Sequence, residues 1–205
     1  MKIATAIIVA IGIAVTVWVG GYPANAASGT DPTWPCIQRK QPQLSIGQMW
    51  PGPQPDDATT ALSRDPQIKA LAARLVQRRL PLDQAETLIA EFTADADNAR
   101  LTALVQAILA RIEPDRSAMI DGIARYGAKQ VGLAKMIESR RVKMVELEAA
   151  DPPDFDAIDA EEKALDWDER IFTDRQQSLT YVCESPVLLE QRAFALARAI
   201  AAYLD

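Results

Sequence analysis

After residue 62, apolar residues recur at steps of three and four, which is the period of amphipathic α-helices. The first helix is predicted over residues 65–79, because an Asp-Pro pair opens it with a capping aspartate and a proline at the first helical position. A second helix is predicted over residues 83–92. A third begins at residue 97 or 98 and is expected to end at Glu113-Pro114, since proline interrupts a helix. Strand-like alternation does not occur, so the pattern predicts an all-α fold.

A longer helical pattern follows over residues 114–150, and it is typical of a coiled coil. Its seam contains six apolar and two polar residues: Ile123, Tyr126, Gln130, Leu133, Ile137, Arg140, Met144 and Leu147. Residues 151–154, Asp-Pro-Pro-Asp, break this helix. The next helix has a seam residue every seven positions, at Ile158, Leu165, Phe172 and Leu179. A short turn joins helices antiparallel, so residues 114–182 are predicted to form a long coiled-coil-like hairpin on a small helical bundle.

One seam residue, Arg140, is charged. The register set by the turn places it opposite Leu165, with Glu161 and Asp168 one helical turn to either side. An unpaired charge in an apolar seam is costly, so we expect an ion pair across the hairpin. The alternative is that Arg140 points outward to a carboxylate of a partner. A nearby aromatic residue, Trp167, is expected to pack in the core.

Residues 27–62 are rich in proline and are predicted to form an extended arm. Trp34 and Trp50 in this arm are expected to dock it on the helical body; the alternative is a strip that binds a partner. The chain has two cysteines, Cys36 and Cys183. In an oxidising compartment an even pair indicates a disulfide, whereas the alternative is two free buried thiols.

The first 26 residues have the order of a secretory signal peptide. Lys2 is followed by an apolar run over residues 3–19, by helix breakers, and by the small residues Ala24-Asn25-Ala26. We expect cleavage after Ala26 and a periplasmic product with no stable membrane span. The alternative is an uncleaved anchor in the inner membrane, because the apolar run approaches the length of a span.

Charge and composition restrict the chemistry. Removing Lys2 leaves 21 basic and 28 acidic residues, a net charge of 21 − 28 = −7, which argues against nucleic acid as a partner. Histidine is absent, so the commonest general base and transition-metal ligand is missing. We therefore predict no cofactor and no enzymatic activity.

Two local patterns remain as candidates. Residues 151–169 are strongly acidic and include Asp154, Asp156 and Asp159. We expect these acids to pair with bases across the hairpin; the alternative is a cation site or a site for a basic partner, although the spacing does not fit an EF-hand loop. Glu184-Ser185 is similar to the catalytic pair of lytic transglycosylases, but the downstream Gly-Leu-Met-Gln-like element of that family is absent. We interpret this pair as a turn before a last helix that starts at Pro186.

The sequence is most consistent with a non-enzymatic interaction or scaffold protein that presents its helical hairpin to a protein of the cell envelope. A cation-binding or envelope-sensing module at the acidic tip is the second hypothesis. A cell-wall hydrolase that uses Glu184 is the third.

Overall fold

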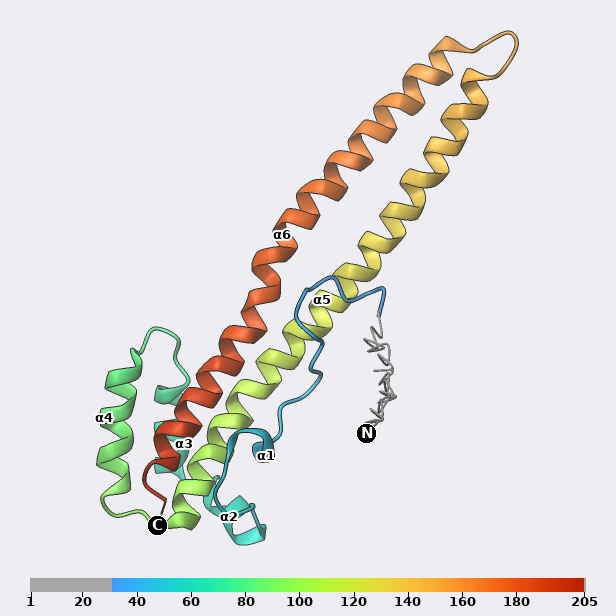
Figure 1. Ribbon diagram of the computed structural model, residues 1–205. Helices are drawn as coiled ribbons and strands as arrows, with labels where there is room; N and C mark the ends of the chain where they lie inside the picture. Colours follow the sequence, from blue (N-terminus) through green and yellow to red (C-terminus); the bar gives the residue numbers. More distant parts are fainter. Residues whose placement is uncertain (1–30, 205) are drawn as a thin grey trace, which may run out of the picture. The chain divides into compact units, whose positions relative to one another are not determined.

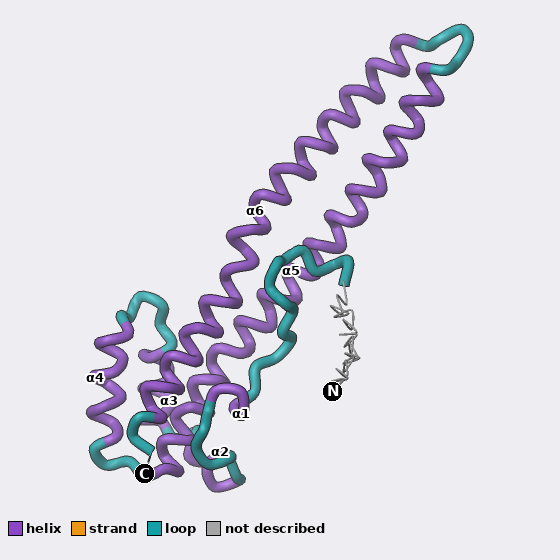
Figure 2. Tube along the Cα trace, in the orientation of Figure 1, coloured by secondary structure: helices purple, strands orange, loops and turns teal. Residues whose placement is uncertain are grey.

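A computed structural model describes residues 31–204, and these form six α-helices and no strand. The helices are α1 (Ile46–Met49), α2 (Asp57–Leu62), α3 (Pro66–Leu75), α4 (Leu82–Thr93), α5 (Asn98–Glu148) and α6 (Phe155–Ala201). Figure 2 shows how little of this part of the chain is loop. The predicted all-α fold is confirmed. The predicted signal peptide, residues 1–26, lies outside the described residues.

Helices α5 and α6 form the predicted antiparallel hairpin, whose far half extends beyond the other helices (Figure 1). Helix α5 has 51 residues and is therefore about 76 Å long at 1.5 Å per residue. At the tip, Asp154 caps α6, because its side chain accepts a hydrogen bond of 3.0 Å from the Ala157 amide.

Two predicted helix boundaries are wrong. Pro114 lies inside α5 and Pro186 lies inside α6, so the hairpin helices span 98–148 and 155–201 rather than 114–182. A proline in a helix interior costs about 3 kcal/mol. Apolar residues on both sides of Pro114 (Ile112 and Ile120) are buried, and so is Leu189 in the turn after Pro186. Each such side chain contributes about 1.5–3 kcal/mol when it is buried, so packing outweighs the local cost.

The body of the protein is formed where α3 and α4 pack against the first turns of α5 and the last turns of α6. Its core contains the most deeply buried apolar side chains: Ile68, Leu75, Ile89, Leu101, Leu104, Ile108, Leu196 and Ile200. Asp65 caps α3 as predicted, by accepting a hydrogen bond of 2.8 Å from the Gln67 amide.

A long-range contact sets the other end of α3, which stops at Leu75 rather than at Arg79. Arg192 of α6 is buried, and its Nε and Nη2 atoms donate to the Leu75 carbonyl at 3.0 and 2.6 Å. Its Nη1 atom donates to the Leu80 carbonyl at 2.8 Å. One arginine thereby satisfies the Leu75 carbonyl, which the end of α3 leaves unpaired, and the Leu80 carbonyl in the loop before α4.

The proline-rich arm is docked, but it is not extended throughout. It contains the short helices α1 and α2, whose N-caps are Ser45 and Asp56. Short stretches without proline, 43–50 and 56–65, leave enough free amides for single helical turns. Trp50 is only 3% exposed and belongs to the core of the body. The interpretation of Trp50 as a docking residue is thus confirmed.

Candidate functional site

The seam of the hairpin contains a partly buried charge network centred on Arg140. The Nε atom of Arg140 donates to Asp168 Oδ2 at 2.7 Å, and its Nη1 atom donates to Glu161 Oε1 at 2.8 Å. Lys143 adds a bond of 2.6 Å to Glu161 Oε2. The predicted cross-hairpin pairing is confirmed, and Arg140 points into the seam rather than outward to a partner.

The network favours the ionised form of Glu161. Hydrogen bonds from Lys143 and Arg140 lower the pKa of Glu161, and the hydrogen bonds that Arg140 donates to Glu161 and Asp168 raise the pKa of Arg140. Glu161 and Asp168 are each more than 90% buried, so a slipped register would leave them without partners. The network therefore selects one alignment of the two helices.

The arm crosses the hairpin at the level of Gly127 and is fixed there covalently. Cys36 and Cys183 form the predicted disulfide, with their Cα atoms 5.6 Å apart. A Cβ atom on Gly127 would lie 2.1 Å from the Thr33 carbonyl oxygen, so only glycine permits this close approach of arm and α5. Trp34 is half-buried, and its indole N–H donates to the Gln38 carbonyl at 2.7 Å.

A second buried arginine holds the arm nearer the body. The guanidinium of Arg116 is 1% exposed and binds Glu190 of α6, with an Nε–Oε1 distance of 2.7 Å. The same group donates to the backbone carbonyls of Gln41 and Pro42 in the arm. Arg116 thus joins the arm, α5 and α6 at one point.

Beside the disulfide lies a groove of about 530 Å³ between the arm and the two long helices. Gln130, Phe172 and Leu179 line it, and Glu184 contributes the single carboxylate of the lining. Glu184 and Ser185 lie in the middle of α6, so the expected turn at these residues is wrong. The reason is the continuation of α6 through Pro186.

The acids of the hairpin tip do not converge. Asp156 and Asp159 are exposed, and Asp154 is engaged as the cap of α6. Within residues 31–204, no three acidic or cysteine side chains approach closely enough to hold a metal ion. The expected pairing of the acidic stretch with bases across the hairpin is found farther from the tip, where Arg141 Nη2 donates to Glu169 Oε1 at 2.7 Å.

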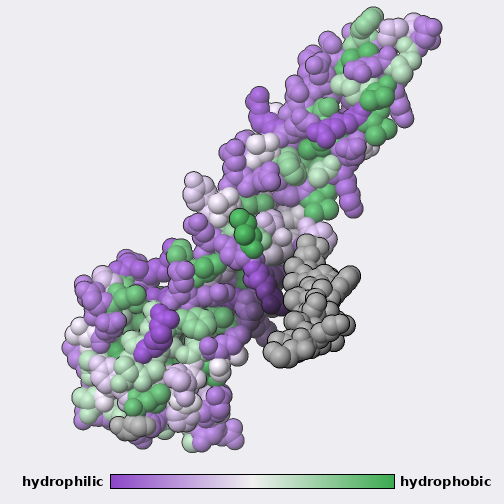
Figure 3. All heavy atoms as spheres, viewed as in Figure 1, coloured by the Kyte–Doolittle hydropathy of each residue, from purple (hydrophilic) through white to green (hydrophobic). Residues whose placement is uncertain are grey.

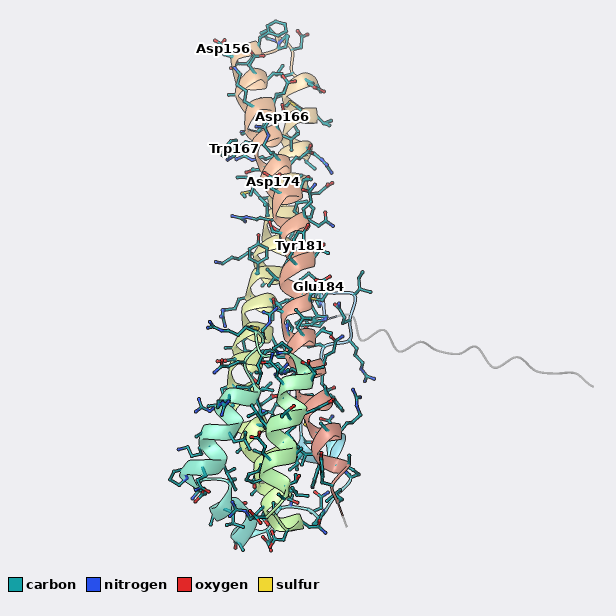
Figure 4. All side chains as sticks on the ribbon, turned by 90° about the vertical axis from the view of Figure 1, so that its left-hand side faces the viewer. Asp156, Asp166, Trp167, Asp174, Tyr181 and Glu184 are labelled. Atoms are coloured by element: carbon teal, nitrogen blue, oxygen red, sulfur yellow. A yellow bond between two sulfur atoms is a disulfide. The ribbon has the colours of Figure 1, made fainter. Side chains whose placement is uncertain are left out.

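The side of α6 that faces away from the seam presents aromatic and acidic residues to solvent (Figure 4). Trp167, Asp174 and Tyr181 follow one another at intervals of seven residues, and the two aromatic side chains are 60% and 78% exposed. The expectation that Trp167 packs in the core is wrong, because the seam passes through Leu165 and Asp168 on the other side. We call the surface formed by Trp167, Asp174 and Tyr181, with the exposed charged residues around them, the outer face of α6.

The exposed surface of α6 along the hairpin is acidic. Between Asp156 and Glu184, α6 has six exposed acids and two exposed bases: Asp156, Asp159, Glu162, Asp166, Asp174 and Glu184 against Lys163 and Arg170. Figure 3 shows the projecting half of the hairpin as a largely hydrophilic surface with hydrophobic patches. The fourteen-residue interval between Trp167 and Tyr181, which is two heptads, was the sequence signal for this surface.

The chain matches no known protein family, no curated protein and no solved structure. None of the helices in residues 31–204 is long and apolar enough to cross a membrane.

Proposed function

We propose that the protein is a non-enzymatic interaction protein, and that the outer face of α6 binds a helix of a partner. The observation that supports this most directly is the exposure of Trp167 and Tyr181, two heptads apart, on a projecting, internally braced hairpin. Side chains two heptads apart lie on one face of a helix and match every second heptad of a helix laid alongside. Exposed tryptophan and tyrosine are also the residues that most often dominate binding energy at interfaces.

The chemistry of the partner follows from charge. Between Asp156 and Glu184, six exposed acids against two exposed bases give the exposed surface of α6 a net charge of −4. A partner helix with apolar residues at heptad spacing and flanking lysine or arginine residues is complementary to it. Such complementarity accelerates association and weakens as salt is added.

We further propose that the protein acts in the periplasm after cleavage of a signal peptide. The N-terminal pattern of residues 1–26 supports export, and the Cys36–Cys183 disulfide is compatible with an oxidising compartment. Intact mass and N-terminal sequencing of the envelope form test this. A mature N-terminus at Ala27 is expected, whereas a membrane-bound form that retains Met1 would replace cleavage by anchoring.

A photo-crosslinking residue at position 174 tests the binding face in cells. It lies between Trp167 and Tyr181, and the same group at Tyr203, an exposed aromatic position of the body, is the control. We expect one envelope protein to be captured at position 174 and not at position 203. The same crosslinks at both positions, or none at position 174, would refute the proposal.

A second measurement uses the captured partner after purification. Trp167→Ala combined with Tyr181→Ala is expected to weaken binding at least about tenfold, since each aromatic anchor contributes more than about 1.4 kcal/mol at a hot spot. Tyr203→Ala removes an aromatic side chain of the body that is 45% exposed, and this variant is expected to bind like the wild type.

A further inference from the structure

Helix α5 has a second heptad pattern on the side that faces away from the seam. Steps of four and three residues connect eight positions: Ala124, Ala128, Val131, Lys135, Glu138, Val142, Val145 and Ala149. Six of the eight are apolar, as in a coiled-coil seam. We call these positions the outer stripe of α5.

The outer stripe is accessible along the projecting part of the hairpin. Val142 and Val145 are 54% and 65% exposed, and Lys135 is also exposed. Glu138 lies 3.7 Å from Arg141 on its own helix, but 70% of its side chain remains exposed. Two exposed valines one turn apart, next to unburied charges, form an unpartnered helix face.

The order of residues in the outer stripe is self-complementary when two copies run antiparallel. With the centre between Lys135 and Glu138, Lys135 of each copy faces Glu138 of the other, and Val131 faces Val142. Further out, Ala128 faces Val145 and Ala124 faces Ala149. A parallel arrangement would instead place lysine on lysine and glutamate on glutamate, which is unfavourable.

We propose that two copies of this chain associate through the outer stripe of α5, antiparallel and related by a two-fold axis. A two-fold interface uses the same surface on both copies, and the pattern of the stripe meets that requirement. The two central Lys135–Glu138 pairs fix the register, and the valines on either side exclude water from them.

The size of the contact predicts the strength of the association. Residues 124–149 span 25 steps of 1.5 Å, or about 38 Å. Each helix covers a strip about 38 Å long and about 10 Å wide on the other, so the dimer buries about 800 Å² in total. This area is below the range of stable complexes. The dimer is therefore weak and depends on protein concentration.

The arm crosses α5 at Gly127 and leaves Ala128 exposed, so the stripe stays accessible at that end.

This dimer does not rest on the function proposed for α6. The outer stripe is on the other long helix, and the outer face of α6 remains accessible in the dimer. Loss of one interaction therefore need not affect the other: Glu138→Lys is expected to leave crosslinking at position 174 unchanged.

Charge reversal at the centre of the stripe tests the proposal by sedimentation of the oxidised, full chain at concentrations up to about 0.5 mM, appropriate for a small interface. Glu138→Lys and Lys135→Glu each place like charges opposite one another and are expected to weaken self-association at least about 100-fold. An equimolar mixture of the two variants restores complementary pairs and is expected to associate. Glu162→Lys changes the net charge by the same amount as Glu138→Lys, but at an exposed position of α6, and is the control for that variant.

Orientation is tested by single cysteines on the stripe. Val131→Cys mixed with Val142→Cys is expected to form a crosslink between the two variants under oxidation, whereas Val142→Cys alone is not. A wild-type chain that is monomeric at every concentration overturns the proposal. Equal weakening by Glu138→Lys and Glu162→Lys, or a crosslink from Val142→Cys alone, does the same.

Discussion

Gly127 allows a quantitative test of how the arm is held. A Cβ atom at this position would lie 2.1 Å from the Thr33 carbonyl oxygen and 3.0 Å from Pro35 Cδ. Ordinary contact requires 3.4 Å, so the arm backbone would have to move by 3.4 − 2.1 = 1.3 Å. Forcing an extra carbon into a packed contact costs about 1–3 kcal/mol. Against this, alanine is about 1 kcal/mol more favourable than glycine inside a helix.

Gly132 provides a matched control on the same helix. It is exposed, and a Cβ atom there would meet nothing within 4 Å. Gly132→Ala is therefore expected to raise the free energy of unfolding by about 1 kcal/mol. Gly127→Ala should gain the same helix propensity but lose the arm contact, so it is expected to be about 1–3 kcal/mol less stable than Gly132→Ala.

Urea unfolding of both variants measures this difference. The disulfide between Cys36 and Cys183 restrains the arm near Gly127, so reduction should let the arm shift and should decrease the difference between the two variants. Equal stability of Gly127→Ala and Gly132→Ala in the oxidised state would refute the conclusion that the arm lies directly on α5 at Gly127.

Three further predictions concern stability. Reduction of Cys36–Cys183 is expected to lower the free energy of unfolding by up to about 5 kcal/mol, since the bond closes a loop of 147 residues; coincident denaturation curves with and without reductant would contradict this. The pKa of Glu161 is lowered in the folded state, so its stabilising contribution is present above its ordinary pKa of 4.5 and is lost as the pH falls through the lowered value. Urea titrations should therefore show Glu161→Gln less stable than the wild type at pH 7 and the two converging in acid; a constant difference would disprove the assignment. Arg192→Met removes three hydrogen bonds at the end of α3 and is expected to cost about 3 kcal/mol in denaturant unfolding. Arg198→Met, at an exposed position of the same helix, should change stability by less than about 0.5 kcal/mol, and a loss as large as that of Arg192→Met would contradict the capping role.

Local patterns were sufficient to predict the hairpin and its alignment. Apolar residues at steps of three and four identify helices because side chains at those spacings share a face. The Pro152-Pro153 turn is short, so counting outward from it places Arg140 between Glu161 and Asp168, as the structure confirms. The pairing of Cys36 with Cys183 required only that the chain has two cysteines.

The tertiary structure decided what local preference could not. Pro114 and Pro186 are helix breakers by propensity, yet both helices continue because buried neighbours outweigh the local cost. Arg116 and Arg192 look like ordinary surface arginines in sequence, but each binds backbone carbonyls more than 70 residues away. Tryptophan is a large, mostly apolar residue that is typical of a core. Trp167 nevertheless lies on the outer face of α6, because the seam passes on the opposite side of that helix. In each case the deciding contact is between residues far apart in the chain, and only the packing of the arm, α3 and the two long helices brings them together.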